Sequence, residues 1–350
     1  MTAYVLIVSS RRPNLLALRQ MSRGDKALVR PLIEVVARDD DDSPKVAAGR
    51  VLKELHRQRL LDSGIDIALD TWPLAARFGA SGAHEALGIL AGDLGVGAFR
   101  PVIDINDAPE DLAKVRHVMN DLHTGVCLRV RPPFVFSLSD PRILLEQLGA
   151  VGEPVERADL VLDCGHVTSA AGTRVDIAGP LSLLLGHPWR SVTVAGGSFP
   201  AAPFPAEPAV PTVTPIQRCE PDLRNLIRWS WSGIGYGDYG VDHPGPPPPD
   251  KTRPPPNLRY TVGPTWVCYS WPKRRTDGNT GFFDLCRKLV ESPHWRAHGP
   301  GFSWGDGQIA RAARGQGGPG GPTEWKAYSL SHHLAVVAGM LREEEAYETR

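Results

Sequence analysis

Several short apolar segments of this chain end in an acidic residue, and these acids have the clearest potential for chemistry. Carboxylates bind magnesium and calcium ions through oxygen, and they also act as general acids and bases. We therefore take five acids as candidate catalytic residues: Glu34 in PLIEV, Asp70 in IALDT, Asp104 in PVIDI, Asp163 in LVLDC and Asp238 in GYGDY. Of these, Asp104 and Asp163 are the expected ligands of a divalent cation such as magnesium, although the sequence does not determine the cofactor.

Basic, glycine and aromatic residues stand at comparable places in the chain. Arginine binds phosphate through paired donors, and glycine turns offer backbone N–H groups to it. The expected ligand-binding residues at these places are Arg129, Arg131, Gly196, Gly197, Ser198 and Tyr239. The combination is typical of phosphoester chemistry. A structural interpretation is equally open, in which the acids pair with the two arginines or cap neighbouring helices.

Aromatic and charged residues also occur together near the C-terminal end. Trp304 and Asp306 lie in FSWGD, and Trp325 lies in EWK. Aromatic rings beside charge can stack on a nucleotide base, so these three residues are further ligand-binding candidates. The alternative is that the tryptophans fix the C-terminal segment to the rest of the protein. His332 and His333 are adjacent in a predicted helix, where neighbours point in different directions, so they are not expected to share a metal ion.

The elements that must bring these residues together are predicted from the apolar pattern. Segments rich in Val, Ile and Leu without strict alternation are typical of parallel strands that are buried on both faces. We predict eight of them, at residues 4–8, 28–36, 65–69, 100–105, 125–130, 159–163, 191–195 and 232–239. Helical patterns lie between them, for example at residues 44–61, where Ser43 is the expected cap, and at residues 109–122.

Regular alternation of strand and helix predicts an α/β protein of the (β/α)8 TIM-barrel type. In such a barrel the carboxyl ends of the strands meet at one mouth, which would gather the acids and arginines named above. A doubly wound open sheet is the alternative. We prefer the barrel because no GxGxxG turn follows the first strand and because the number of strands suits closure.

The chain is expected to divide into a barrel and a C-terminal elaboration. Residues 1–242 are predicted to form the barrel, and residues 243–257 a proline-rich loop or linker that cannot join a helix or a central strand. Residues 258–350 are predicted to pack on the barrel and close it. Within them, residues 258–271 resemble a strand pair, and residues 282–290 and 329–345 resemble helices.

Composition limits the classes of function. The chain has 39 basic and 39 acidic residues, so no overall field favours general nucleic-acid binding or an anionic membrane. No segment is long and apolar enough to span a bilayer, and no secretory signal is visible. The five cysteines are scattered without metal-ligand spacing, which favours reduced thiols in the cytoplasm. We expect Cys127 and Cys164 to be unpaired and at least partly buried.

The order of several motifs resembles that of a known family. PLIEV, LDT, PVIDI, LRVR and LDCG, followed by FSWGD and a distal SHHL, are similar to the Beta protein family of phages and bacteria over nearly the whole chain. The resemblance implies a context of antagonism towards a phage-encoded killer protein, known for a satellite-phage member, and of mobile defence loci. It implies no catalytic residues, and no GxSxG, P-loop, HExxH or Rossmann fingerprint is present.

Two hypotheses of function follow. In the first, the protein belongs to a phage-defence or antitoxin-like system and acts by binding a protein partner from the same locus, or a ligand, on a barrel scaffold. In the second, it is a metal-assisted hydrolase or phosphodiesterase that acts on a nucleotide-like phosphate ligand. The family context and the lack of a complete catalytic motif favour the first.

Overall fold

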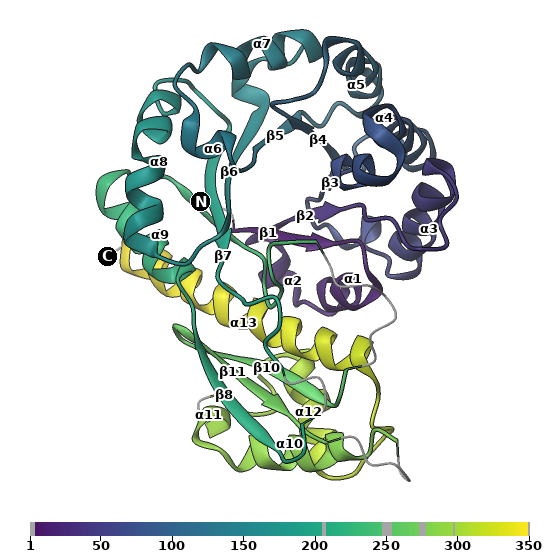
Figure 1. Ribbon diagram of the computed structural model, residues 1–350, viewed down its shortest axis with the longest axis vertical. Coiled ribbons are helices and arrows are strands. Elements are labelled where there is room, and N and C mark those ends of the chain that lie inside the picture. Colours follow the sequence, from purple (N-terminus) through teal and green to yellow (C-terminus); the bar gives the residue numbers. More distant parts are fainter. Residues whose placement is uncertain (1–3, 205–207, 247–253, 273–277, 297, 349–350) are drawn as a thin grey trace.

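The core of the protein is a closed parallel barrel. The computed structural model describes residues 4–204, 208–246, 254–272, 278–296 and 298–348. The barrel strands are β1 (Tyr4–Ser9), β2 (Val29–Glu34), β3 (Ala68–Asp70), β4 (Arg100–Asp104), β5 (Val126–Val130), β6 (Ala158–His166), β7 (Ser191–Gly197) and β9 (Gly235–Asp238). Strand β9 pairs with both β7 and β1, which closes the ring (Figure 1). This confirms the predicted α/β fold of the TIM-barrel type, and every predicted strand overlaps a barrel strand.

Helices surround the barrel on the outside (Figure 1). They are α1 (Arg12–Arg19), α2 (Arg23–Lys26), α3 (Pro44–Arg57), α4 (Ala75–Leu94), α5 (Pro109–Leu122), α6 (Phe134–Ser137), α7 (Arg142–Val151), α8 (Ala170–Leu184) and α9 (Glu220–Ser230). The Ser43 hydroxyl caps α3 by accepting a hydrogen bond from the Val46 N–H at 3.3 Å, as the sequence predicts. Proline in the first turn of α3 and α5 costs no hydrogen bond, because those N–H groups have no partner within the helix.

A second body, the lobe, lies on one side of the barrel (Figure 1). Its sheet has the antiparallel order β10 (Asn257–Val262), β11 (Thr265–Ser270) and β8 (Thr212–Gln217). Helices α10 (Gly281–Glu291), α11 (Pro293–Arg296) and α12 (Trp304–Ala313) belong to the same body. Strand β8 departs from the expected division, because it falls within residues 1–242 and yet pairs with β11. The barrel has no place for it, since β7 and β9 pair directly with each other.

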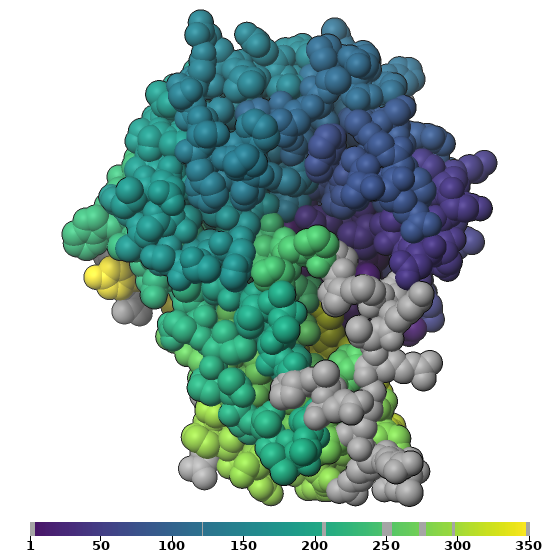
Figure 2. Space-filling model, in the orientation of Figure 1, coloured from purple at the N-terminus to yellow at the C-terminus, as the bar shows by residue number. Residues whose placement is uncertain are grey.

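Helix α13 (Pro322–Glu348) crosses between the barrel and the lobe (Figure 1). The two faces of strands β10 and β11 pack into different apolar cores. Leu258, Tyr260 and Val267 pack into the core of the lobe, whereas Trp266 and Cys268 on the other face pack with the barrel core. Figure 2 shows the lobe in direct contact with the barrel. The lobe is therefore joined to the barrel by a shared apolar core.

The cysteines, the apolar helices and the proline-rich segment were also subjects of expectations from the sequence. Cys127 and Cys164 are unpaired and buried, as predicted. No helix in the described part of the chain is long and apolar enough to cross a membrane. Much of the expected proline-rich linker, residues 247–253, lies outside the described residues.

Candidate functional site at the barrel mouth

Strand ends that face the barrel interior build the polar mouth. Leu32, Val102 and Val161 fill the middle of the barrel. Side chains two residues further along a strand point the same way, which places Glu34, Asp104 and Asp163 above them at the carboxyl ends. We call the residues that meet there the mouth cluster: Glu34, Asp70, Asp104, Arg129, Arg131, Asp163 and Tyr239.

Arg129 is the centre of the mouth cluster. Its Nη1 donates to Asp70 Oδ2 at 2.6 Å and to Glu34 Oε1 at 2.9 Å. Its Nε and Nη2 both donate to Asp163 Oδ2, at 3.0 and 2.7 Å. The Tyr239 hydroxyl donates to the same oxygen of Asp163 at 2.6 Å. The side chain of Arg129 is only 1% exposed, so one buried cation holds three acids together.

Arg131 continues this network to the next strand, because it bonds both Asp70 and Asp104. The second oxygen of Asp104 accepts from the amide nitrogen of the Asn106 side chain at 2.7 Å. The strand-end acids and arginines that the sequence singled out on β2 to β6 are thus brought into one network.

Each strand-end aspartate is oriented by its own backbone. One carboxylate oxygen accepts a hydrogen bond from the N–H two residues later, at 3.0 Å in Asp70, 3.0 Å in Asp104, 2.9 Å in Asp163 and 2.8 Å in Asp238. This turn fixes one oxygen to the backbone and leaves the other for a side-chain partner. The repeated geometry explains why the carboxylates are rigidly placed.

The charges of the mouth cluster are balanced unevenly. Burial alone would raise the pKa of Asp163, but Arg129, the Tyr239 hydroxyl and the Gly165 N–H hold that pKa below its usual value. In Glu34 the result is opposite, because burial raises the pKa although Arg129 opposes it. Asp163 is therefore held as an anion, whereas Glu34 takes up a proton more readily than a free glutamate does.

The two expected metal ligands each have an arginine partner. Asp104 is bonded to Arg131, and Asp163 is bonded to Arg129. In the part of the chain that the structure describes, no group of three His, Cys, Asp or Glu residues has the spacing of a metal site. The arginines occupy the carboxylate oxygens that a cation would need.

Asp238 departs from the expected position. It lies beside Leu6 on β1 and faces outward with Tyr4 and Tyr236, away from the barrel interior. Its Oδ2 accepts from the Tyr236 hydroxyl at 2.7 Å and lies 3.1 Å from His333 Nε2 on α13. We call Tyr4, Arg218, Tyr236, Asp238 and His333 the seam cluster, because it lies between the barrel and α13. Asp238 is fully buried there and does not reach the mouth.

Gly196 and Gly197 are the last residues of β7 and do not form a turn after it, and the N–H group of Ser198, which follows them, already has a partner within the chain. The Glu220 carboxylate accepts from the Ser198 N–H at 3.0 Å and from the Ser198 hydroxyl at 2.7 Å. A side chain of this protein therefore already fills the anion position. Gly196 and Gly197 instead permit close packing, because a Cβ would lie 2.6 Å from Val167 in the first case and 2.7 Å from Pro244 in the second.

Trp304 and Asp306 lie on α12 of the lobe, and Trp325 lies on α13 and packs into the core of the lobe. Trp325 is 1% exposed and stacks on Phe282 with ring centroids 5.2 Å apart. Trp304 packs edge-on against Tyr328. Asp306 is fully buried and accepts from the Tyr260 hydroxyl at 3.0 Å, and His332 Nδ1 lies 2.9 Å from it. The alternative was that the tryptophans fix the C-terminal segment to the rest of the protein, but their ring contacts are with Phe282 and Tyr328 in the core of the lobe.

A large cavity opens beside the mouth cluster. It has a volume of about 920 Å³ and lies between the ends of β1, β2, β7 and β9 and the lobe. Glu34 and Tyr239 are the members of the mouth cluster that line it. Its wall also carries basic residues that the sequence analysis did not single out: Arg11, Arg12, Arg38, Arg259 and Lys326. The pair Arg11 and Arg12, directly after the first strand, was a detectable signal, since loops at strand carboxyl ends form barrel sites. We call this space the mouth cavity.

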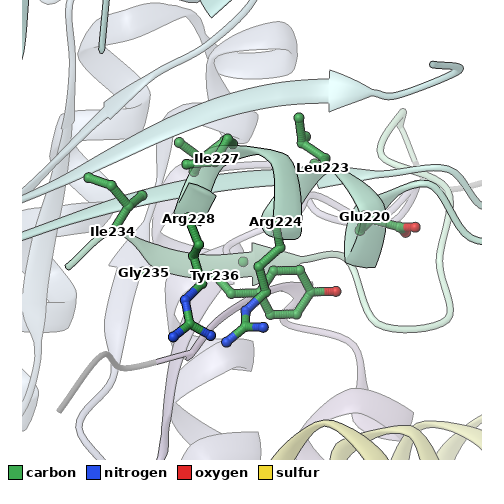
Figure 3. A pocket seen from close by; sticks show the side chains of 11 residues that line it. Glu220, Leu223, Arg224, Ile227, Arg228, Ile234, Gly235 and Tyr236 are labelled. Atoms are coloured by element: carbon green, nitrogen blue, oxygen red, sulfur yellow. The ribbon is translucent and has the colours of Figure 1, made fainter. Parts of the chain in front are cut away.

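Another pocket, between α9 and β9, is too small for a ligand. Its volume is about 10 Å³. Figure 3 shows Arg224 and Arg228 pointing the same way from α9, with Leu223 and Ile227 on the opposite side. Both arginines bond Glu344 near the end of α13. These basic groups therefore fasten two helices together.

The fold and the mouth define the class of protein as a (β/α)8 barrel with a polar mouth and a C-terminal lobe. The sequence model of the family described as Beta protein matches residues 4–339. This chain therefore belongs to the Beta protein family, as its motifs predicted. No curated protein matches the chain.

Proposed function

We propose that this Beta-family protein acts by binding, and that a small anionic, nucleotide-like ligand occupies the mouth cavity. The observation that carries the proposal is a cavity of about 920 Å³ at the carboxyl ends of the barrel strands, where β/α barrels place their sites. Basic residues line it from both bodies, with Arg12 and Arg38 on the barrel and Lys326 on α13. Arg38 also interacts electrostatically with Asp41, whereas the side chain of Arg12 is exposed and forms no ion pair with the described residues, so Arg12 is available to an anion.

The setting that we propose is a phage-defence or antitoxin-like system, in which binding antagonises a protein partner from the same locus. Family membership supports this setting. The free thiols of all five cysteines support a cytoplasmic location, because reducing compartments keep thiols unpaired. Occupancy of the mouth cavity would then regulate, or be regulated by, contact with the partner.

A second candidate function is metal-assisted hydrolysis of a nucleotide-like phosphate ligand. Glu34 favours it, because this acid lines the cavity and burial raises its pKa towards the range of a general acid or base. Any divalent cation would have to arrive with the ligand phosphates, since Asp104 and Asp163 are held by arginines.

A ligand screen by thermal shift tests the binding proposal. Wild-type protein is heated with a panel of nucleotides and other small anions, beside an Ala201→Trp variant that narrows the cavity at an exposed lining position. A ligand that binds only the folded state raises the midpoint of unfolding, and at about 100 times its Kd it adds about 2.7 kcal/mol. We expect a shift in the wild type that is lost in Ala201→Trp. A panel without any shift, or equal shifts in both proteins, would contradict the proposal, and consumption of a bound nucleotide would favour the hydrolase.

A further inference from the structure

One corner of the mouth cavity is built by both bodies of the protein. Phe199 follows β7, and Asp242 follows β9, so the barrel supplies one side. Arg259 comes from β10 of the lobe and Lys326 from α13. Phosphate sites of β/α barrels commonly lie at the loops after the seventh and eighth barrel strands, beside the start of an additional helix. Strands β7 and β9 are the seventh and eighth strands of this barrel, and α13 is the additional helix.

The guanidinium group of Arg259 is held in a fixed orientation in this corner. Its Cζ lies 5.1 Å from the ring centroid of Phe199 and 5.5 Å from that of Phe204. Its Nη1 donates to the Val241 carbonyl at 3.1 Å and to Asp242 Oδ1 at 3.2 Å. Stacking and hydrogen bonding on one side thus preorganise the group, which lowers the entropy that a ligand must remove.

The opposite edge of the same guanidinium has no acceptor. Nε of Arg259 is buried without a hydrogen-bond partner among the described residues, and Nη2 forms no hydrogen bond with them either. These two groups are the parallel donors with which arginine binds a planar oxyanion. The protein uses the same edge elsewhere, since Arg190 directs Nε and Nη2 to the two oxygens of Asp159 at 2.9 and 2.5 Å. In Arg259 this edge is left for a group from outside the chain.

Positive charge also exceeds negative charge in the corner. Asp242 is shared between two cations, because its Oδ2 lies 2.7 Å from Lys326 Nζ while its Oδ1 bonds Arg259. Burial lowers the pKa of Lys326, and Arg259 and Arg11 lower it further against the opposing effect of Asp242. An additional anion would relieve the repulsion among these cations.

We propose that Arg259 and Lys326 form an oxyanion subsite that binds a phosphoryl group of the ligand in the mouth cavity. The ligand would accept hydrogen bonds from Nε and Nη2 of Arg259 and from Nζ of Lys326. This inference rests on the proposed function, and it specifies which group of the ligand is recognised and where. It also makes the lobe part of the binding site, since neither residue belongs to the barrel.

Titration calorimetry with pyrophosphate and with adenosine monophosphate tests the subsite. We expect both to bind the wild type, and Arg259→Gln and Lys326→Gln to weaken each by about tenfold or more. Arg259→Lys keeps the charge but loses the paired donors, so its affinity should fall between those of the wild type and Arg259→Gln. Arg142→Gln is the matched control, because it removes one arginine charge from an exposed site outside the mouth cavity. Binding in Arg259→Gln equal to that in Arg142→Gln would overturn the subsite.

Additional ligands and variants distinguish a failure of the oxyanion subsite from a failure of the mouth cavity as the binding site. Adenosine lacks the phosphoryl group and should bind at least about tenfold more weakly than its monophosphate. Citrate that binds in an Arg259-dependent way while pyrophosphate does not would overturn the choice of phosphoryl over carboxylate. A ligand that is lost in Ala201→Trp but retained in Arg259→Gln would overturn the subsite and leave the mouth cavity as the binding site. Circular dichroism and melting curves establish that each variant is folded. If Arg259→Gln does not fold, the affinity of Arg259→Lys is compared with that of the wild type instead.

Discussion

The two ends of the barrel carry similar charged residues, but these residues differ in burial and in whether they adjoin a cavity. The amino-terminal end has a base cluster of Arg30, Asp66, Arg100, Asp159 and Arg190, in which Arg190 makes a paired contact with Asp159. In the mouth cluster at the other end, Arg129 also directs Nε and Nη2 to one carboxylate, but both groups donate to the same oxygen, Asp163 Oδ2. Asp66 is 42% exposed at the base, whereas Arg129 and Asp163 are almost fully buried. Of these two clusters, only the mouth cluster lies beside the large cavity, through Glu34 and Tyr239.

This difference between the base cluster and the mouth cluster shows that an Asp–Arg network is not by itself a sign of function. Removing the partner of a carboxylate near solvent lowers the free energy of unfolding only a little, whereas removing the partner of a buried carboxylate lowers it by several kcal/mol. Both clusters link neighbouring strands at the ends of the barrel, and a catalytic role is not needed to explain either. Function is indicated where such a network adjoins a cavity with unpaired donors, which is the case at the mouth alone among the described residues of these two clusters.

The largest expected effect contrasts Arg129→Met with Arg190→Met. The first change leaves Asp70, Asp163 and Glu34 without their shared cation in a buried place, so we expect it to destabilise the protein by about 3 to 5 kcal/mol. The second leaves Asp159, which is itself buried, with Arg100 and Arg30 still within 4 Å, and we expect a smaller loss of about 1 to 2 kcal/mol. Urea unfolding of both variants measures the free energies. Equal losses would show that the two ends do not differ in burial energetics.

A smaller effect concerns pH and the seam cluster, which lies away from both ends of the barrel. Hydrogen bonds and the nearby His333 and Arg218 outweigh burial and lower the pKa of Asp238 to about 2, and burial lowers the pKa of His333. Both groups therefore bind protons more weakly in the folded state. Their contribution to stability is fully present above the unfolded pKa of histidine, about 6.5, and is lost as the pH falls, first through His333 and then through Asp238.

Melting curves between pH 8 and pH 4 check this prediction, with a His333→Gln variant as the control. The free energy of unfolding of the wild type should fall by about 1.4 kcal/mol for each unit by which the folded pKa of His333 is lowered. The variant should lack this part of the decrease. Parallel stability curves for the two proteins would show that His333 titrates as it does in the unfolded chain.

Much of the barrel was predictable from sequence, because buried strands have a strong apolar signal and barrel topology places their carboxyl ends together. That rule sufficed for Glu34, Asp70, Asp104 and Asp163. It failed for Asp238, because the strand GYGDY contains two glycines inside the barrel and so gives no apolar alternation to show which residues face inward. The inward residue on this strand is Tyr239, one position later.

Strand β8 and the lobe's contribution to the cavity could not be predicted from the sequence, for a different reason. Strand β8 joins the lobe through pairing with β11, some fifty residues later in the chain, and no local pattern reveals such a partner. Arg259 and Lys326 reach the mouth cavity only because α13 and β10 dock beside the barrel. The sheet of the lobe could be expected from its strand pair, but the residues that it contributes to the cavity could not.

We expect the mouth to be the functional end of the barrel and the base to be structural. The most direct test of this expectation is the affinity of a phosphorylated ligand for Glu34→Gln compared with Asp66→Asn, each of which removes one carboxylate charge, at the mouth and at the base respectively. Loss of the negative charge of Glu34 beside the cavity should tighten binding by about fivefold, or about 1 kcal/mol, whereas Asp66→Asn should leave the affinity unchanged. Equal affinities for the two variants and the wild type would contradict the account.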